Sequence, residues 1–199
     1  MRAPLLATGL VILGGAAAAA PGSVYVDQVG VGNRAVVTQS GGPGARARVV
    51  QQGDANTTRI DQAGPQSSAE AVQDGAANDT TVQQTGGAQA MRSGQAGAGN
   101  RIELRQIGPG ANEAVLSQSG ERNALALTQE GSANRADLSQ QGEDNAMTAA
   151  QTGDNNKLKW AQEGAGLLDL NVLQSGGAAV SITQTYGGVP VAVITNGRP

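Results

Sequence analysis

The sequence predicts an all-β fold, a two-sheet parallel β-solenoid whose stacked coils each contain about 22 residues. Fifteen glutamines between Gln28 and Gln184, in a chain of 199 residues, recur at intervals of 11 residues ten times, 12 residues three times and 10 residues once. Glycine follows fourteen of them by two residues, and asparagine precedes nine of them by six. Regular repetition at this length is typical of stacked-repeat proteins, so two successive units predict one coil with two strands.

Each unit is expected to contain one strand that ends at its glutamine, with the residues four and two positions earlier pointing inward. Nearly all of these residues are apolar and none is charged, whereas the positions between them carry most of the charges. Such alternation has the period of a half-buried strand, not of a helix. The predicted inward pairs are Val24/Val26, Ala35/Val37, Ala47/Val49, Thr58/Ile60, Ala69/Ala71, Thr80/Val82, Met91/Ser93, Ile102/Leu104, Ala114/Leu116, Leu125/Leu127, Ala136/Leu138, Met147/Ala149, Leu158/Trp160, Leu170/Val172 and Val180/Ile182.

The segment after each glutamine predicts a turn, because glycine adopts positive φ without a Cβ penalty. The three longer intervals can place their extra residue in turns, at 41–44, 108–111 and 164–167. An insertion there keeps the inward face of the next strand, whereas one inside a strand would reverse it. The expected turn glycines are Gly30, Gly41, Gly53, Gly64, Gly75, Gly86, Gly97, Gly108, Gly120, Gly131, Gly142, Gly153, Gly164 and Gly176.

Stacking of equal coils places identical amide side chains above one another, where they can hydrogen-bond from coil to coil. One expected glutamine ladder contains Gln28, Gln51, Gln73, Gln95, Gln118, Gln140, Gln162 and Gln184, and the other contains Gln39, Gln62, Gln84, Gln106, Gln129, Gln151 and Gln174. The asparagines expected to stack beside the turns are Asn33, Asn56, Asn78, Asn100, Asn112, Asn123, Asn134, Asn145 and Asn156.

The two ends of the chain differ from the repeats. Residues 1–20 predict a signal peptide, with Arg2 before a short apolar stretch and a cleavage site near Ala19 or Ala20. Residues 21–199 then form a single solenoid. The segment Val189–Thr195 is expected to be the sixteenth strand, which would complete eight coils. The exposed strands of the first and last coils are the expected contact surfaces for another chain.

Composition argues against most other classes of protein. Without histidine or cysteine the chain lacks the usual general base, thiol nucleophile and zinc ligands, so we expect no enzyme, cofactor or metal site. A net charge of −3 with scattered signs predicts neither a nucleic-acid partner nor a charged membrane surface, and nothing indicates a small-molecule substrate. Abundant Gly, Gln and Asn would also fit disorder, but the regular spacing favours a fold.

The unit resembles the curlin repeat, S-x5-Q-x-G-x2-N-x-A-x3-Q. Residues 28–39 and 129–140 each reproduce its Q-x-G-x2-N-x-A-x3-Q part, and the resemblance extends from about Val24 to Thr195. Curli fibres are functional amyloids of the biofilm matrix. The resemblance therefore implies an amyloid-forming, secreted cell-surface subunit of a Gram-negative-type bacterium. It also implies self-association, another curlin subunit, a curli-type secretion pore and chaperones as partners.

Three alternatives remain open. The family contains a major subunit and a minor, surface-associated nucleator, which the repeat does not separate. A soluble β-solenoid could instead bind or adhere through a flat outer face, although the outward columns of this chain are heterogeneous. Calcium could bind turn acids such as Asp54, Asp144 and Asp154, but solvated charges are the better interpretation because the usual Gly-rich nonapeptide is missing.

Overall fold

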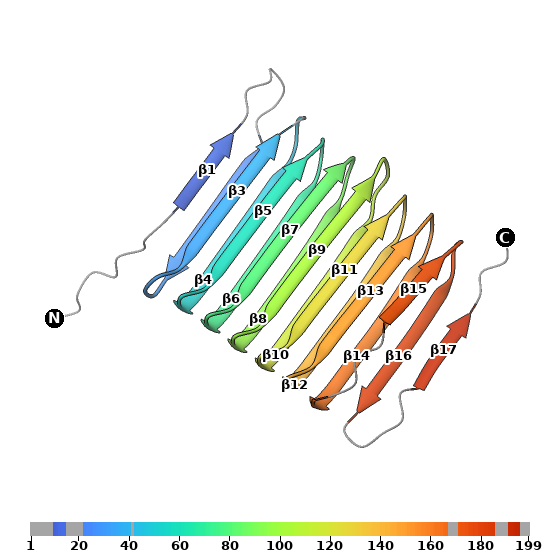
Figure 1. The fold of residues 1–199 in the computed structure, drawn as a ribbon. Coiled ribbons are helices and arrows are strands. Elements are labelled where there is room, and N and C mark those ends of the chain that lie inside the picture. Colours follow the sequence, from blue (N-terminus) through green and yellow to red (C-terminus); the bar gives the residue numbers. More distant parts are fainter. Residues whose placement is uncertain (1–9, 15–21, 41, 167–170, 186–190, 196–199) are drawn as a thin grey trace.

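A computed structural model describes residues 10–14, 22–40, 42–166, 171–185 and 191–195. Within these ranges the regular structure is entirely β (Figure 1). The strands are β1 (Leu10–Gly14), β2 (Ser23–Val29), β3 (Arg34–Ser40), β4 (Arg46–Asp54), β5 (Thr57–Ala63), β6 (Ser68–Ala76), β7 (Asp79–Gly86), β8 (Ala90–Ala98), β9 (Arg101–Gly108), β10 (Glu113–Glu121), β11 (Ala124–Glu130), β12 (Arg135–Glu143), β13 (Ala146–Thr152), β14 (Lys157–Ala165), β15 (Asn171–Ser175), β16 (Ala179–Thr185) and β17 (Val191–Thr195).

The strands form two sheets in which every second strand along the chain is a neighbour. Sheet A has the order β1-β3-β5-β7-β9-β11-β13-β15, and sheet B has the order β2-β4-β6-β8-β10-β12-β14-β16-β17. Every pairing is parallel except that of β16 with β17. Seven coils, from β2–β3 to β14–β15, therefore stack as a parallel β-solenoid, which confirms the predicted fold class.

The register aligns each repeat with the next. Gln51 pairs with Gln73 in sheet B and Gln62 with Gln84 in sheet A, and the same alignment holds along both sheets. The inward positions form one thin core between the sheets, in which Trp160 is the largest fully buried side chain. The longer intervals at Gly42–Gly44 and around Gly108 lie in turns and leave this alignment intact.

The glutamines are not the last strand residues, which corrects one expectation. Strands β4, β6, β8, β10, β12 and β14 continue past their glutamine and the following glycine. Gly53, for example, still pairs with Gly75 in the ladder. Because equivalent turn segments, each with glycine at the same place, follow one another at the same spacing, backbone pairing extends into the turn.

The prediction for the last strand is wrong. Residues 191–195 do not join sheet A as a parallel sixteenth strand; they form β17, which pairs antiparallel with β16 in sheet B. The segment Val-Ala-Val-Ile-Thr is apolar at both alternating sets of positions and has no ladder glutamine, so its sequence specifies neither face nor register. The described structure contains seven closed coils followed by the unclosed half-coil β16.

At the other end, β1 pairs parallel with β3 at the edge of sheet A. It lies inside the predicted signal peptide, where the sequence Leu-Val-Ile-Leu-Gly has high β propensity. Sheet A therefore gains an edge strand from a segment that we expected to be removed.

Oppositely charged side chains lie on neighbouring strands at the outer faces. Arg135 bonds Glu113 on the neighbouring strand at 2.8 Å. Asp137 and Lys159 are register partners as well, but they form no ion pair among the described residues. These pairs are exposed and add little stability.

Candidate functional site

The two glutamine ladders run through the interior. From Gln51 onwards in sheet B, each Nε2 donates to Oε1 of the glutamine in the next coil at 2.7 to 2.9 Å. Sheet A repeats the pattern from Gln39 to Gln174 at 2.8 to 2.9 Å, with 2.7 Å between Gln129 and Gln151. All the amides point the same way, so each ladder has a donor end and an acceptor end.

The same glutamines also join the two sheets. Gln73 Nε2 donates to the carbonyl oxygen of Thr57 at 3.0 Å, and Gln106 Nε2 donates to that of Ala90 at 3.1 Å. Equivalent bonds recur at Gln51, Gln62, Gln84, Gln95, Gln129, Gln151 and Gln174. Sequence spacing does not show these bonds, because they depend on how far a side chain reaches across the coil.

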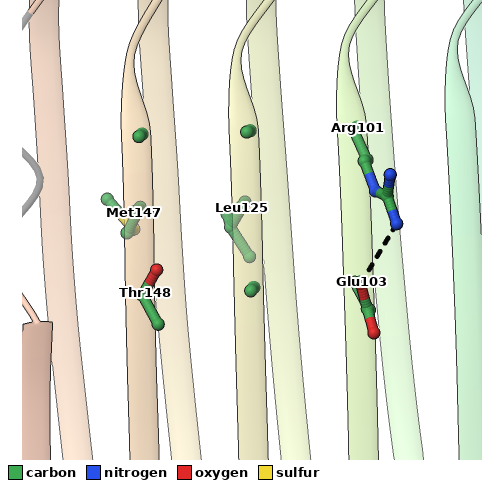
Figure 2. A pocket seen from close by; sticks show the side chains of 8 residues that line it. Arg101, Glu103, Leu125, Met147 and Thr148 are labelled. Atoms are coloured by element: carbon green, nitrogen blue, oxygen red, sulfur yellow. Dashed lines mark hydrogen bonds and ion pairs between the residues drawn. The ribbon is translucent and has the colours of Figure 1, made fainter.

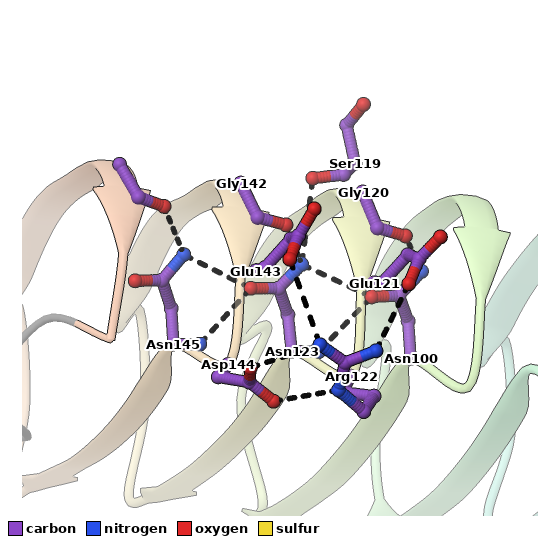
Figure 3. Close-up of polar contacts among 11 residues, drawn as sticks. Asn100, Ser119, Gly120, Glu121, Arg122, Asn123, Gly142, Glu143, Asp144 and Asn145 are labelled. Carbon is purple, nitrogen blue, oxygen red and sulfur yellow. Dashed lines mark hydrogen bonds and ion pairs between the residues drawn. The ribbon is translucent and has the colours of Figure 1, made fainter.

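The asparagines form a second network at the turns (Figure 3). Asn100 Nδ2 donates to the carbonyl oxygen of Gly120 in the next coil at 2.9 Å, while its Oδ1 accepts the backbone N–H of Asn123 at 3.1 Å. The same two bonds recur along Asn33, Asn56, Asn78 and Asn123, and Asn145 Nδ2 donates likewise to the carbonyl oxygen of Gly164. The asparagines therefore satisfy buried backbone groups where the sheet hydrogen bonds end.

The asparagines just described lie in the turns that lead into sheet A. The turns that lead into sheet B form a second column, which contains a ladder residue that sequence analysis missed. Gln89 stands at the asparagine position, where its Nε2 donates to the carbonyl oxygens of Gly108 and Gly110, both at 3.0 Å. Its place six residues before Gln95 was the available signal. Ser67 occupies the same column one coil earlier, and its buried hydroxyl has no hydrogen-bond partner among the described residues.

The turn glycines are needed for two reasons. They adopt positive φ, as at Gly75 with φ of 116°. In addition, a Cβ at Gly75 would lie 2.0 Å from the carbonyl oxygen of Gly97 in the next coil. The clash recurs in nearly every coil from Gly30 to Gly142 and disappears at Gly153 and Gly176, near the end of the stack. Gly41 lies outside the described residues.

Two of the three polar inward residues take part in the ladders. Thr58 and Thr80 donate their hydroxyls to Gln73 and Gln95 of the opposite sheet at 2.9 and 2.8 Å. The Ser93 hydroxyl is buried without a partner.

The turn acids considered for calcium lie in separate turns and already have partners. Asp54 accepts the Val31 N–H at 2.8 Å, Asp154 accepts the Ser132 N–H at 2.7 Å, and Asp144 binds Arg122 at 2.8 and 2.9 Å (Figure 3). The Arg122 guanidinium lowers the pKa of Asp144, while hydrogen bonding to Asp144 raises the pKa of Arg122. Among the described residues, no three acidic groups gather in a way that could hold a metal ion.

The outer face of sheet A has a shallow hollow, of about 100 Å³ (Figure 2). Ala124, Ala126 and Ala146 form its floor, and Arg101 and Glu103 on β9 border it. The hollow forms because the outward side chains become small where alanines on β11 and β13 follow the charged residues of β9. The two charged residues on its border bond each other, since Arg101 donates to Glu103 at 3.3 Å.

The ends of the stack differ most from its middle. The hydrophobic residues that pack on the core but stay only partly buried are Val24, Val26, Val172 and Val180, which all lie on β2, β15 or β16. Leu173 on β15 is 76% exposed. The outer edges of β2 and β15 have no neighbouring strand among the described residues. The ends therefore present an unfinished core beside unpaired strands.

No protein-family model matches the chain, and neither the curated proteins nor the solved structures include a match. Among the described residues, no helix has the length and apolar character needed to cross a membrane.

Proposed function

We propose that this chain is a structural subunit of extracellular, curli-like functional amyloid fibres that assembles by end-to-end stacking of solenoids. The incomplete burial at both ends is the observation that carries the proposal. Interior inward residues such as Val49 and Leu138 are fully buried because a coil lies on each side, whereas Val26 and Val172 have a coil on one side only. A second copy would supply the missing coil.

Stacking would extend every interaction of the interior. A new coil adds backbone hydrogen bonds to an open strand edge, continues the apolar core and lengthens both amide ladders. The coil repeat is the same along the chain, so a junction between copies can reproduce a junction between coils. The growing fibre would then be the fold of the monomer, continued.

The direction of the ladders favours head-to-tail assembly. In the bonds between ladder glutamines, Nε2 always donates toward the C-terminal end of the stack. The side-chain oxygens of Gln28 and Gln39 are therefore the acceptors that face the N-terminal end. Contact between two N-terminal ends would oppose acceptors to acceptors. Head-to-tail contacts without a closing rotation generate open filaments.

The resemblance to curlins supplies the biological setting of this proposal: secretion, a cell-surface location, a second curlin subunit, a secretion pore and chaperones. A non-enzymatic, structural role agrees with a chain whose hydrogen-bonding side chains are committed to stacking. A minor curlin that nucleates fibres uses the same ends, so nucleation is the second candidate. Adhesion by a soluble solenoid is the third, and the shallow hollow on sheet A is a concave surface that it could use.

Assembly kinetics test the proposal. The mature protein, incubated alone, should develop cross-β signal after a lag and give a reflection at about 4.7–4.8 Å. A lag-free rise when traces of it are added to a separate major curlin would instead identify a nucleator. A protein that stays a soluble monomer in both experiments contradicts both functions.

A pair of variants on β2 shows whether the end surface is responsible. Val26→Lys places a charge on the inward side of this edge strand and should abolish fibre growth. Val29→Lys places the same charge on the exposed outer side and should leave growth unchanged. Equal growth of the two variants would argue against stacking through this end.

A further inference from the structure

Strand β17 occupies the edge that end-to-end stacking requires. It pairs antiparallel with β16, with Ala179 beside Thr195 and Thr183 beside Val191. Every other strand in sheet B pairs in parallel with glutamine beside glutamine. A coil added beyond β17 could not place its glutamine next to Gln184, so β17 interrupts the ladder.

The number of parallel strands leaves a matching vacancy in the other sheet. The predicted leader, which contains β1, is left out of this comparison. The parallel strands of sheet B are then the even-numbered strands from β2 to β16, and those of sheet A are the odd-numbered strands from β3 to β15. Among the described residues, the half-coil β16 therefore has no counterpart in sheet A, beside β15. Copies cannot stack with both sheets continuous until one more strand fills this position.

We propose that β17 is a removable cap, and that the β16 edge it covers is the docking site for β2 of a second copy. This inference rests on the proposed function. During assembly, β17 would leave β16 and pair in parallel with β15. The move would complete the eighth coil and expose the β16 edge at once.

The β16 edge fits β2 in sequence and length. Both strands contain seven residues. If Gln28 lies beside Gln184, Val24 lies beside Val180 and Val26 lies beside Ile182. Each of these four apolar residues then gains an apolar neighbour across the junction. Asp27 is the only charged residue of either strand and lies beside Thr183, so no like charges meet.

The β15 edge fits β17 equally well. With Thr195 beside Gln174, Val193 lies beside Val172 and Ile194 lies beside Leu173. Leu173 is the most exposed large hydrophobic residue in the described part of the chain. Residues 186–190 join β16 to β17, whereas the shorter segment 64–67 is enough to cross between sheets from β5 to β6, so the connection is long enough for either position.

Engineered disulfides distinguish the two positions of β17, because the natural chain has no cysteine. Ser181 and Val193 are register partners in the capped state, and neighbouring strands lie within disulfide range. Oxidised S181C/V193C should be a soluble monomer that loses elongation on preformed seeds, and reduction should restore it. L173C/I194C should cross-link in fibres and should not cross-link in the monomer.

The outcomes separate this inference from the proposed function. If oxidised S181C/V193C elongates as fast as its reduced form, β17 is not a cap, although the fibre proposal stands. If S181C/V193C fails to cross-link in the monomer, or L173C/I194C fails to do so in fibres, the proposed exchange is wrong. If the reduced proteins and the natural chain never assemble, both proposals fail.

Discussion

Gly75→Ala should destabilise the solenoid by about 3 kcal/mol or more, from left-handed backbone strain and from overpacking against the next coil. The added Cβ would lie 2.0 Å from the Gly97 carbonyl oxygen, a backbone atom that cannot move without breaking the register of the stack. The same oxygen accepts a hydrogen bond from Asn78 Nδ2 at 3.0 Å, so displacing it also disturbs the asparagine ladder. Urea denaturation of the monomer, followed by circular dichroism, measures this loss.

Gly94→Ala is the matched control. Gly94 lies inside β8, where an added Cβ meets nothing within 4 Å. Replacing a glycine in a strand interior by alanine should be neutral or stabilise the fold by about 0.5–1 kcal/mol. Similar denaturation midpoints for the two variants would contradict the role assigned to the turn glycines.

Asn100→Asp should cost about 3–5 kcal/mol at neutral pH, because it leaves a buried charge without a compensating partner. The asparagine Nδ2 donates to Gly120 O, Ala96 O and Asn78 Oδ1 at 2.9, 3.2 and 3.1 Å. A carboxylate has the same shape but cannot donate, so it would face three oxygens. The free energy of unfolding at pH 7 checks this value.

Asn155→Asp makes the same substitution at an exposed turn position, where φ is 62°. Away from buried networks a surface change is expected to stay within about 0.5 kcal/mol. If Asn100→Asp were equally mild, the asparagine ladder would not be a structural requirement of the stack.

The sequence predicted the stacking, because the glutamine spacing sets the register and insertions in turns preserve it. The alignment of Gln51 with Gln73 and the burial of Ile60, Leu104 and Leu138 follow from spacing and alternation alone. The bonds from the glutamines to the opposite sheet could not be predicted, since they depend on the width of the coil.

The end strands escaped prediction for a different reason. β17 carries no ladder residue and has apolar residues at both alternating sets of positions, so neither its sheet nor its direction was specified. Gln89 was overlooked because glutamine replaces asparagine there, although its spacing to Gln95 fits the unit. Patterns predict elements that repeat, and they fail where a segment departs from the repeat.

A fibre that continues the fold of the monomer has a mass per unit length that is set by the height of one solenoid. Scanning transmission electron microscopy on single protofilaments measures this quantity. Stacked solenoids of about eight coils, each about 4.8 Å high, predict one chain for every 35–40 Å or so of fibre. One chain for every 4.8 Å or so, as in amyloids whose chains stack in register as single layers, would contradict it.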